Sequence, residues 1–488
     1  MRFSELLADL SLRGLSPKRL TPANLDPEIT EITQDSREVP RGSLFVAIDG
    51  IRMDGHEFIR TVAESGAAAL LVERDVPIPE GFAAAQFKDG RLALAYAAAS
   101  LQGNPSEEMT VVGITGTDGK STTSVLTVEA LLACGVPAGG MTSLDFRVLD
   151  RIEQNDSYMT TLESPVIQAR LRELVDAGVK AAVLEVTSHG LALHRVDAVA
   201  FDIAAYTNLT HEHLDFHGTI DAYREAKLQL ADLARQSPRK PGVPKAIVYN
   251  ADEPAWQTLA SAPTDRRLTY GLERPADVFG TNVRARIDGI GFTARTRDGE
   301  VEVSLPITGR FNVYNALCAL AIGRAMGLSL DRAAQGLAKA RGLRGRMQVL
   351  NAGQPFAIVI DFAHTPDGLE KVLGELRSLT RGRLLTVFGA PGDRDVTKRP
   401  LMGEAVGRLA DEFVITTDDP RHESAADISA AIAQGAEAAG RRHGVDYRVI
   451  IDRREAIREV LASARPGDTV LLAGKGHEDR MLIGDETL

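Results

Sequence analysis

The residues with the most evident chemistry lie in the stretch TVVGITGTDGKSTT, residues 110–123. An apolar run is followed by a glycine-rich turn, a lysine and three hydroxyl residues. Glycines let backbone N–H groups converge on phosphate oxygens, and a helix N-terminus adds positive potential. Lys120 would neutralise the β- and γ-phosphates of a nucleotide, and the hydroxyl of Ser121 or Thr122 would ligate Mg²⁺. The stretch therefore predicts a phosphate-binding loop between a buried strand and a helix.

The glycine spacing of this loop departs from the usual P-loop pattern, G-x-x-x-x-G-K-[ST]. That pattern would place its first glycine at Ile114. A simple strand–helix turn with a surface lysine is the alternative, and the residue types favour ATP. The residues expected to bind ATP here are Gly116, Thr117, Asp118, Gly119, Lys120, Ser121 and Thr122.

A second group of polar residues follows two further apolar runs. LEVTSHGLALHRV (184–196) carries Glu185, and TNLTHEHLDFHGT (207–219) carries three histidines within seven residues. The spacing fits no common zinc pattern. Mg²⁺ prefers a few oxygen ligands and keeps waters, a role that Glu185 fits and that would be less usual for His213. The alternative is a polar loop with solvated histidines.

The elements that must position these residues alternate between strand and helix patterns, which predicts an α/β fold. Three segments are expected: 1–103, 104–342 and 343–488. The third is a regular βα series, typical of a Rossmann-like sheet whose ligands lie beyond the carboxyl ends of the strands. The predicted strands are 42–48, 68–73, 110–115, 181–187, 201–207, 246–250 and, in the third segment, the runs FAIVID, RLLTVFGA, EFVITTD, DYRVIID and DTVLLAG.

Composition excludes several classes of protein. The chain has 488 residues, 44% of them hydrophobic, and a net charge of −11, which argues against nucleic-acid binding. Its two cysteines are far apart in apolar helical patterns, so we expect buried free thiols. No run of 18 apolar residues occurs and the N-terminus has no signal-peptide pattern. We therefore expect a protein of the cytoplasm that does not insert into a membrane.

The compact form T-G-T-[ND]-G-K-[ST]-T of the loop resembles that of the Mur ligase superfamily, which includes the folylpolyglutamate synthetases. The resemblance implies that ATP phosphorylates a carboxylate and that an amine then displaces the phosphate. DSREVPRGSLFVAIDGIRMDGHEFI (35–59), FNVYNAL (311–317), LRGRMQV (343–349), DFAHTPDGLEKVL (361–373) and GKGHED (474–479) are similar to family members that add the third amino acid of the muramyl peptide.

The resemblance implies a UDP-binding N-terminal α/β domain, a central P-loop-type ATPase domain with a parallel sheet and a Rossmann-like C-terminal domain that binds the amino acid. The implied substrates are UDP-N-acetylmuramoyl-L-Ala-D-Glu, ATP and a diamino acid, with Mg²⁺ as cofactor. The chain would act as a monomer. Relatives generally continue beyond the point where this chain ends, so a truncated chain is one expectation.

The family's functional residues carry over by motif. Glu185, His213 and Lys227 match the second metal site, with Lys227 carbamylated by CO₂ in the Y-x-x-A-K segment. Further adenosine contacts would be Asn312, Arg346 and Asp361. Contacts to the UDP precursor would be Ser36, Ile51, Arg52, Met53, Thr160, Thr161, Ser188 and Arg195. Contacts to the amino acid would be Arg394, Asp418, Asp419, Pro420, Arg421, Gly474 and Glu478.

Departures from the family pattern affect the substrate more than the reaction. They are Met159, Leu162, Leu193, Ala390 and Pro391, together with Asp419 in place of Asn in D-N-P-R. D-N-P-R implies meso-diaminopimelate, since Arg421 would bind its distal carboxylate. Asp419 leaves L-lysine or L-ornithine open, because it could pair with Arg421 or attract an ammonium. A folylpolyglutamate synthetase and a non-catalytic nucleotide or precursor sensor are the remaining alternatives.

Overall fold

The computed structural model describes residues 1–22, 24–50, 53–157, 159–210 and 212–487. The chain forms two compact units. The first unit comprises Met1–Val278 and Cys318–Ala333, and the second comprises Phe279–Leu317 and Ala334–Leu488. Among the described residues, no helix has both the length and the apolar character needed to cross a membrane.

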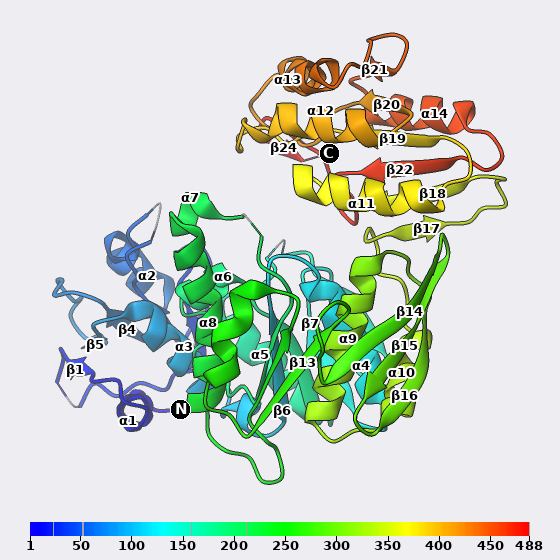
Figure 1. The fold of residues 1–488 in the computed structure, drawn as a ribbon. Coiled ribbons are helices and arrows are strands. Elements are labelled where there is room, and N and C mark those ends of the chain that lie inside the picture. The colour runs from blue at the N-terminus through cyan, green and yellow to red at the C-terminus, as the bar shows by residue number, and fades with distance from the viewer. Residues whose placement is uncertain (23, 51–52, 158, 211, 488) are drawn as a thin grey trace. The chain divides into compact units, whose positions relative to one another are not determined.

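The N-terminal part of the first unit is a five-stranded sheet in the order β1-β5-β4-β3-β2, parallel except for β1 (Figure 1). Both faces are covered: Leu44 and Val46 pack with Phe3 of the first helix, whereas Phe45 packs with Ile59 of the second. Strands buried on both faces read as continuous apolar runs. The elements are α1 (Phe3–Leu12), β1 (Lys18–Arg19), β2 (Glu31–Thr33), β3 (Ser43–Val46), η1 (Gly55–Phe58), α2 (Ile59–Ser65), β4 (Ala69–Val72), β5 (Ala83–Gln86), α3 (Gly90–Leu101) and η2 (Pro105–Glu107).

The rest of the first unit is built on a second sheet, in the order β13-β12-β11-β6-β10-β7-β8-β9. The strands from β12 to β7 are parallel to their neighbours, and β8 and β9 add an antiparallel edge. The strands are β6 (Thr110–Thr115), β7 (Ala138–Met141), β8 (Asp145–Val148), β9 (Arg151–Gln154), β10 (Ala181–Glu185), β11 (Ile203–Tyr206), β12 (Ala246–Asn250) and β13 (Arg266–Gly271). The helices are α4 (Lys120–Ala133), α5 (Ser164–Asp176), α6 (Ser188–Ala192), α7 (Leu214–His217), α8 (Ile220–Gln236) and η3 (Pro254–Ser261).

Strand order in this sheet decides where the site forms. β6 lies between β10 and β11, and all three run parallel. Their carboxyl ends therefore meet at one edge, which brings together the phosphate loop, the segment after Glu185 and the segment after Tyr206.

The second unit contains a six-stranded sheet in the order β17-β18-β22-β19-β20-β21, parallel except for β17 (Figure 1). Side chains of α11, α12 and α13 pack on one face and those of α14 on the other. Its elements are β14 (Val278–Arg286, whose first residue falls in the first unit), β15 (Gly289–Thr296), β16 (Gly299–Leu305), β17 (Gln348–Leu350), β18 (Ala357–Asp361), α11 (Pro366–Leu379), β19 (Leu384–Phe388), α12 (Lys398–Leu409), β20 (Glu412–Ile415), α13 (Ala425–Ala438), β21 (Tyr447–Val449), α14 (Arg453–Ser463), β22 (Thr469–Ala473), β23 (Leu482–Ile483) and β24 (Glu486–Thr487). Helices α9 (Arg310–Ala325) and α10 (Leu330–Ala338) have residues in both units.

The predicted α/β class and every strand predicted from an apolar run are confirmed, with ends shifted by at most three residues. The antiparallel strands β8, β9 and β14 to β16 were not predicted, because their alternating polar residues give no continuous apolar run. Cys318 is buried as expected, whereas Cys134 is only half-buried at the end of α4, so the expectation of two buried thiols is wrong for Cys134. The domain boundaries at residues 103 and 342 remain predictions.

Candidate active site

The loop after β6 has the backbone geometry of a phosphate cradle. Gly119 precedes α4 in the left-handed region at φ 80°, and Gly116 has φ 149°. A Cβ on Gly116 would lie 1.8 Å from Thr207 Oγ1, so no larger residue fits there. Asn208 holds the loop by accepting hydrogen bonds from the N–H groups of Thr117 and Asp118, at 2.8 and 2.9 Å. The glycines of the motif are therefore required by conformation and space.

Two lysines converge on the same carbonyl of this loop. Lys120 Nζ donates to Gly116 O at 3.2 Å and to Thr117 O at 2.7 Å. Lys227 Nζ, from α8, donates to Gly116 O at 2.6 Å. The loop thus gathers two amines at the carboxyl end of β6, where a phosphate would need positive charge.

Lys227 is almost fully enclosed, with 1% of its surface exposed. Its amine lies 4.5 Å from the centre of the Tyr223 ring, and Tyr223 Oη is 3.2 Å from Thr117 Oγ1. Burial lowers the pKa of Lys227 well below its usual range, and repulsion from Lys120 adds to the shift. Lys227 therefore favours the neutral amine far more than an exposed lysine does.

Oxygen donors gather on the other side of the loop. Ser121 Oγ lies 3.0 Å from Ser143 Oγ, and the N–H of Ser143 donates to Glu185 Oε2 at 2.9 Å. Glu185 ends β10 and is 5% exposed. Ser121 and Glu185 are thus linked through one residue, as expected of two contributors to a single oxygen-rich site.

The histidines form a ring cluster around α7. The ring of His189 lies 4.8 Å from that of His213, 4.2 Å from Phe216 and 5.5 Å from His217. His217 Nε2 is 3.0 Å from Ser188 Oγ, and His213 Nε2 is 3.7 Å from the carboxylate of Glu212. Within the described part of the chain, which leaves out His211, no group of three or more His, Cys, Asp or Glu side chains is arranged to hold a metal ion.

A small pocket beside Glu185 contains the predicted precursor contacts Thr160 and Thr161. Thr161 Oγ1 donates to Glu185 O at 3.1 Å. Arg195 donates to Thr161 O at 3.2 Å and pairs with Glu163 at 2.6 Å, while its Nε has no hydrogen-bond partner among the described residues. A guanidinium with an unused buried donor next to two threonines is suited to a carboxylate.

The predicted uridine contacts lie in the N-terminal sheet region of the first unit. Ser36 is half-buried in the turn after β2, and the side chain of Met53 is exposed. Ile51 and Arg52 lie outside the described residues.

The predicted adenosine contacts belong to the second unit. Asp361 ends β18 and accepts hydrogen bonds from the N–H groups of Met347 and Ala363, at 2.7 and 2.8 Å. Arg346 lies over the Phe362 ring, 4.6 Å from its centre. Asn312 donates to Thr308 O at 2.6 Å and is buried.

The segment Asp418–Arg421 follows β20 and meets the segment after β22. Lys475 Nζ contacts Asp419 Oδ1 and Glu478 Oε2, both at 2.8 Å. Asp418 is buried, and desolvation raises its pKa to about 6. Gly474 is required there, because a Cβ would lie 2.4 Å from Asp418 Oδ2.

The loop carrying Arg394 is held against the same segment. Gly392 donates through its N–H to Asp419 O at 2.9 Å, and a Cβ on Gly392 would lie 1.9 Å from Pro420 O. Asp393 contacts His422 Nδ1 at 2.8 Å, and Arg394 itself is exposed. The seven predicted amino-acid contacts therefore lie on neighbouring segments at the carboxyl ends of β19, β20 and β22.

Comparisons with known proteins identify the family of this chain. Family models match in three parts: Mur ligase family, catalytic domain, at residues 28–113; Mur ligase middle domain at 114–323; and Mur ligase, glutamate ligase domain, at 345–476. The chain is 44% identical to a UDP-N-acetylmuramyl-tripeptide synthetase of Roseiflexus sp. (strain RS-1), over 99% of this chain and 96% of the relative. The chain belongs to the Mur ligase family.

Two further relatives carry more specific names. The chain is 41% identical to a UDP-N-acetylmuramoyl-L-alanyl-D-glutamate–2,6-diaminopimelate ligase of Bacillus licheniformis, over 95% of this chain and 92% of the relative. A solved structure of a ligase of the same name is 31% identical and has a TM-score of 0.67, covering 94% of this chain and 92% of its own. The chain is accordingly an ATP-dependent, ADP-forming ligase of this family.

The residues present fit the ATP and Mg²⁺ that Mur ligases use. The cradle around Gly116 offers converging backbone groups and the amine of Lys120, as a polyphosphate requires. The hydroxyl of Ser121 and the carboxylate of Glu185 are oxygen donors of the kind that Mg²⁺ prefers. The histidine-rich segment adds no zinc-like ligand set in the described residues.

Three residues of the site were not predicted: Tyr223, Lys475 and Arg453. Tyr223 and Lys475 lie inside the recognised motifs Y-x-x-A-K and GKGHED, so the motifs contained the signal. Arg453, the first residue of α14, donates to Thr417 O at 3.3 Å and to Ala473 O at 2.6 Å. No local pattern in the sequence marks it, because its partners are 36 and 20 residues away.

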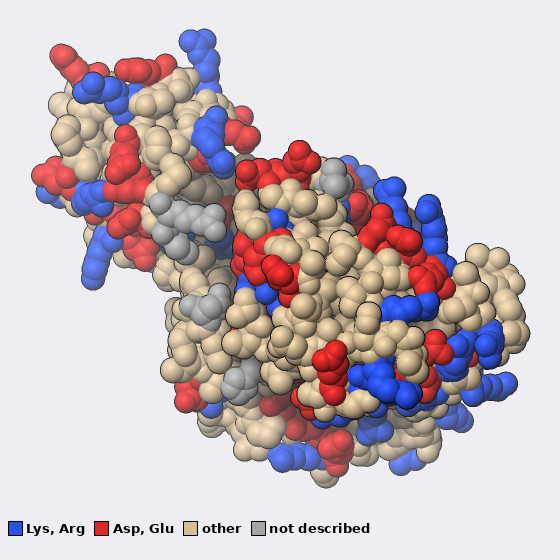
Figure 2. Space-filling model, turned by 90° about the horizontal axis from the view of Figure 1, so that it is seen from above, with Lys and Arg blue, Asp and Glu red and all other residues tan. Residues whose placement is uncertain are grey.

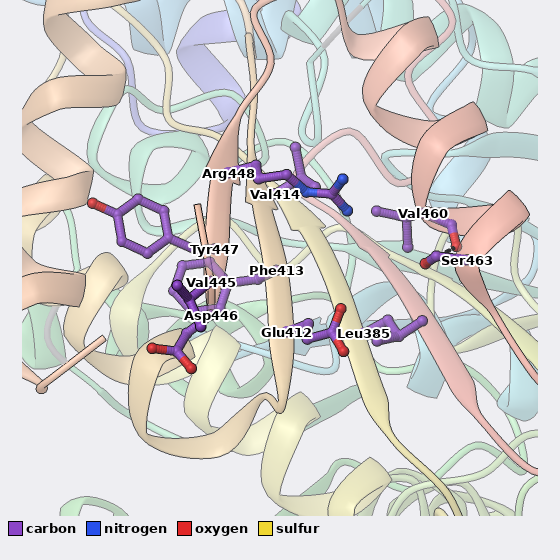
Figure 3. A pocket seen from close by; sticks show the side chains of 10 residues that line it. All are labelled: Leu385, Glu412, Phe413, Val414, Val445, Asp446, Tyr447, Arg448, Val460 and Ser463. Atoms are coloured by element: carbon purple, nitrogen blue, oxygen red, sulfur yellow. Dashed lines mark hydrogen bonds between the residues drawn. The ribbon is translucent and has the colours of Figure 1, made fainter. Parts of the chain in front are cut away.

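A separate pocket of the second unit lies away from all predicted contacts (Figure 3). Glu412 begins β20 and Tyr447 begins β21, so this pocket lies at the amino ends of the strands, opposite the edge that carries Asp418. Its walls mix apolar side chains with Glu412, Asp446, Arg448 and Ser463, and Arg448 is paired with Glu459. We assign no ligand to it.

Proposed function

We propose that this chain joins meso-2,6-diaminopimelate to the D-Glu of UDP-N-acetylmuramoyl-L-Ala-D-Glu, at the expense of ATP, in peptidoglycan synthesis. The observation that carries the proposal is the meeting of Lys120, Lys227 and Glu185 at the carboxyl ends of β6 and β10. The names of the relatives support the choice of substrates. The cytoplasmic location and the monomeric state remain predictions.

In this proposal Lys120 and the loop N–H groups hold the polyphosphate in line with the γ-carboxylate of D-Glu. Arg195 and Thr161 orient that carboxylate, since Arg195 contacts Thr161 and its buried Nε is an unused donor among the described residues. Mg²⁺ bound by Ser121 and Glu185, with His213 as a further contact, would screen repulsion between carboxylate and phosphate. The amine of the diamino acid then displaces phosphate from the activated carboxylate.

The lowered pKa of Lys227 supports its proposed carbamylation. CO₂ reacts with a neutral amine to give a carbamate and a proton, and burial, by lowering the pKa of Lys227, favours the neutral amine. The carbamate would place an anion beside the cation of Lys120. It would also add an oxygen donor for the second metal.

Diaminopimelate is favoured over lysine or ornithine by the contacts of Asp419. Asp419 accepts hydrogen bonds from Lys475 and from the N–H of Leu482. Arg421 has no carboxylate partner among the described residues, and its buried Nε is unbonded there. Arg421 can therefore bind the distal carboxylate of diaminopimelate, a group that lysine and ornithine lack.

A single assay tests the proposal. Purified protein is given ATP, Mg²⁺, the UDP-muramyl dipeptide and one of the three amino acids, and kcat/KM is measured from phosphate release. We expect precursor-dependent release with the highest kcat/KM for diaminopimelate. A tenfold preference for lysine or ornithine, about 1.4 kcal/mol, would replace the amino acid in the proposal. Turnover only with a folate acceptor would indicate a folylpolyglutamate synthetase, and no turnover with any acceptor would indicate a sensor.

A further inference from the structure

Lys475 contacts three carboxylates at the carboxyl ends of β20 and β22. Its Nζ is 2.8 Å from Asp419 Oδ1, 2.8 Å from Glu478 Oε2 and 3.9 Å from Asp418 Oδ1. The side chains of Lys475 and Asp419 are only 11% and 13% exposed, so water screens this pair weakly. The contact is therefore stronger than an ordinary surface ion pair.

Asp419 is held in one orientation by two donors. Besides Lys475, the N–H of Leu482 donates to the same Oδ1 at 2.9 Å. The backbone of Asp419 lies in the left-handed region at φ 42°, and Arg421 follows at φ 51°. Although the two residues are close in sequence, no ion pair joins them in the described structure.

Among the described residues, no second cation forms an ion pair with Asp419 or Glu478. The guanidinium of Arg453 is near enough to act on both carboxylates electrostatically, but its Nη atoms donate to the carbonyls of Thr417 and Ala473. Without Lys475, the carboxylates of Asp419 and Glu478 would lose their shared partner. They would then capture Arg421 or attract a cationic substrate group, because an unpaired, poorly solvated carboxylate is costly.

We propose that Lys475 is a positioning residue that sets the selectivity for the amino acid. By holding Asp419, it leaves Arg421 available for the distal carboxylate of a diamino dicarboxylic acid and keeps Glu478 turned to the substrate's ammonium. This inference rests on the proposed ligase function. It explains how the chain carries an acid at position 419 without becoming selective for a purely cationic side chain.

The test compares kcat/KM for meso-diaminopimelate with kcat/KM for L-lysine, using the full-length protein. Lys475→Met should lower this ratio at least tenfold, mainly through a higher KM for diaminopimelate. Lys475→Arg keeps the cation and should keep the ratio within threefold. Lys475→Met combined with Asp419→Asn should regain most of the ratio, because the acid that needed neutralising is gone.

Asp419→Asn alone keeps the inference testable if Lys475→Met does not fold, as judged by its thermal unfolding. We expect the single change to lower kcat/KM for both amino acids and to leave their ratio within threefold. A tenfold rise in kcat/KM for diaminopimelate relative to that for lysine would show that Asp419 itself attracts ammonium, and would overturn the inference. So would an unchanged ratio in a folded Lys475→Met variant.

Failure of the proposed function gives a different result. Wild-type protein would then ligate none of the amino acids to the UDP-muramyl dipeptide. Each ratio is compared with that of the wild type, so the test of Lys475 stands whichever amino acid the wild type prefers.

Discussion

At the scale of single residues, the site contains ionisable side chains whose pKa values are shifted by burial and by neighbouring charges. Lys227 lies in the middle of an amphipathic helix, where a lysine is normally solvated. Here its amine is buried against Gly116 O and the Tyr223 ring. The sequence alone could not show this, because Gly116 is 111 residues away and only the resemblance singled Lys227 out.

The first prediction concerns this amine. Lys227→Ala should lower kcat by about 100-fold or more, since the proposed carbamate ligand of the second metal is lost. Acetate or propionate should restore part of the rate by placing a carboxylate in the gap. With ¹³CO₂, the wild-type protein should show a carbamate ¹³C signal that the variant lacks. Lys180→Ala, at an exposed lysine before β10, is the control and should keep both the rate and the signal.

The lowered pKa of Lys227 predicts the pH range in which the carbamate forms. Only the neutral amine reacts, and the pKa of Lys227 is lowered by burial. The carbamate signal should therefore persist at neutral pH, where exposed lysines, with a pKa near 10.4, are protonated. A signal that grows only above pH 10 would contradict the buried, neutral amine.

The second prediction concerns Asp418, whose pKa is raised to about 6, chiefly by desolvation. Its carboxyl is ionised above that pH and protonated below it. The value of kcat/KM for the amino acid should therefore fall as pH drops below about 6, because the negative charge near the substrate ammonium is lost. Asp418→Asn should lower kcat/KM at pH 7.5 and remove this acid limb. An acid limb that survives in the variant would assign the titration to another group.

At the scale of elements, local signals predicted the βα units of the second unit well. The predicted helix PDGLEKVLGELRSL coincides with α11 (Pro366–Leu379). Thr365 caps this helix by accepting from the N–H of Gly368 at 3.1 Å, and a proline occupies its first turn. Caps and apolar stripes are local in sequence, so they could be predicted. The pairing of β6 with β10 and β11 is not local in sequence, so no local pattern could predict it.

The loop 238–245 shows what local patterns miss. Its prolines and lysines predict a loop, and no local pattern marks the two lysines as buried. In the structure Lys240 and Lys245 are buried and pair with Asp202 at 2.5 and 3.0 Å. Asp202 precedes β11, is fully buried and also accepts from the N–H of Val111 at 2.9 Å. This cluster fixes the amino ends of β6 and β11, opposite the phosphate loop.

The third prediction follows from that cluster. Asp202→Ala would leave two buried lysines without their carboxylate, which typically costs about 3–5 kcal/mol. Urea unfolding of the full chain should show this loss of free energy of unfolding in the transition of the first unit, which contains Asp202. Asp176→Ala removes a partner of Arg172 that is 67% exposed, and should cost under about 1 kcal/mol. The KM for ATP should stay unchanged in any Asp202→Ala protein that remains folded, because the cluster lies at the far end of the strands.

At the scale of the whole molecule, the distribution of charge bears on how substrates are bound, and the organisation of the cores bears on which segments fold alone. The net charge is −11, and acidic and basic side chains are intermixed over the face seen in Figure 2. In the proposed reaction, substrate anions would therefore be bound by local groups such as Lys120, Arg195 and Arg421. The residue-level assignments came mainly from motif resemblance, since no composition or periodicity distinguishes an acceptor-binding arginine from a surface one.

The last prediction concerns the boundary at residue 343. The core of the Rossmann-like sheet consists of buried residues between Met347 and Ala473, with Ile287 and Phe311 as partly buried neighbours from outside that range. A segment with its own core is expected to fold alone. The fragment 343–488 should therefore unfold cooperatively and give a dispersed NMR spectrum. The fragment 279–488, which adds most of β14 together with β15, β16, α9 and α10, is the comparison. If only the longer fragment folds, the partly buried neighbours are essential and the boundary lies before Phe279. If both fold with similar Tm, the packing of Ile287 and Phe311 contributes little, and the sequence-derived boundary is correct.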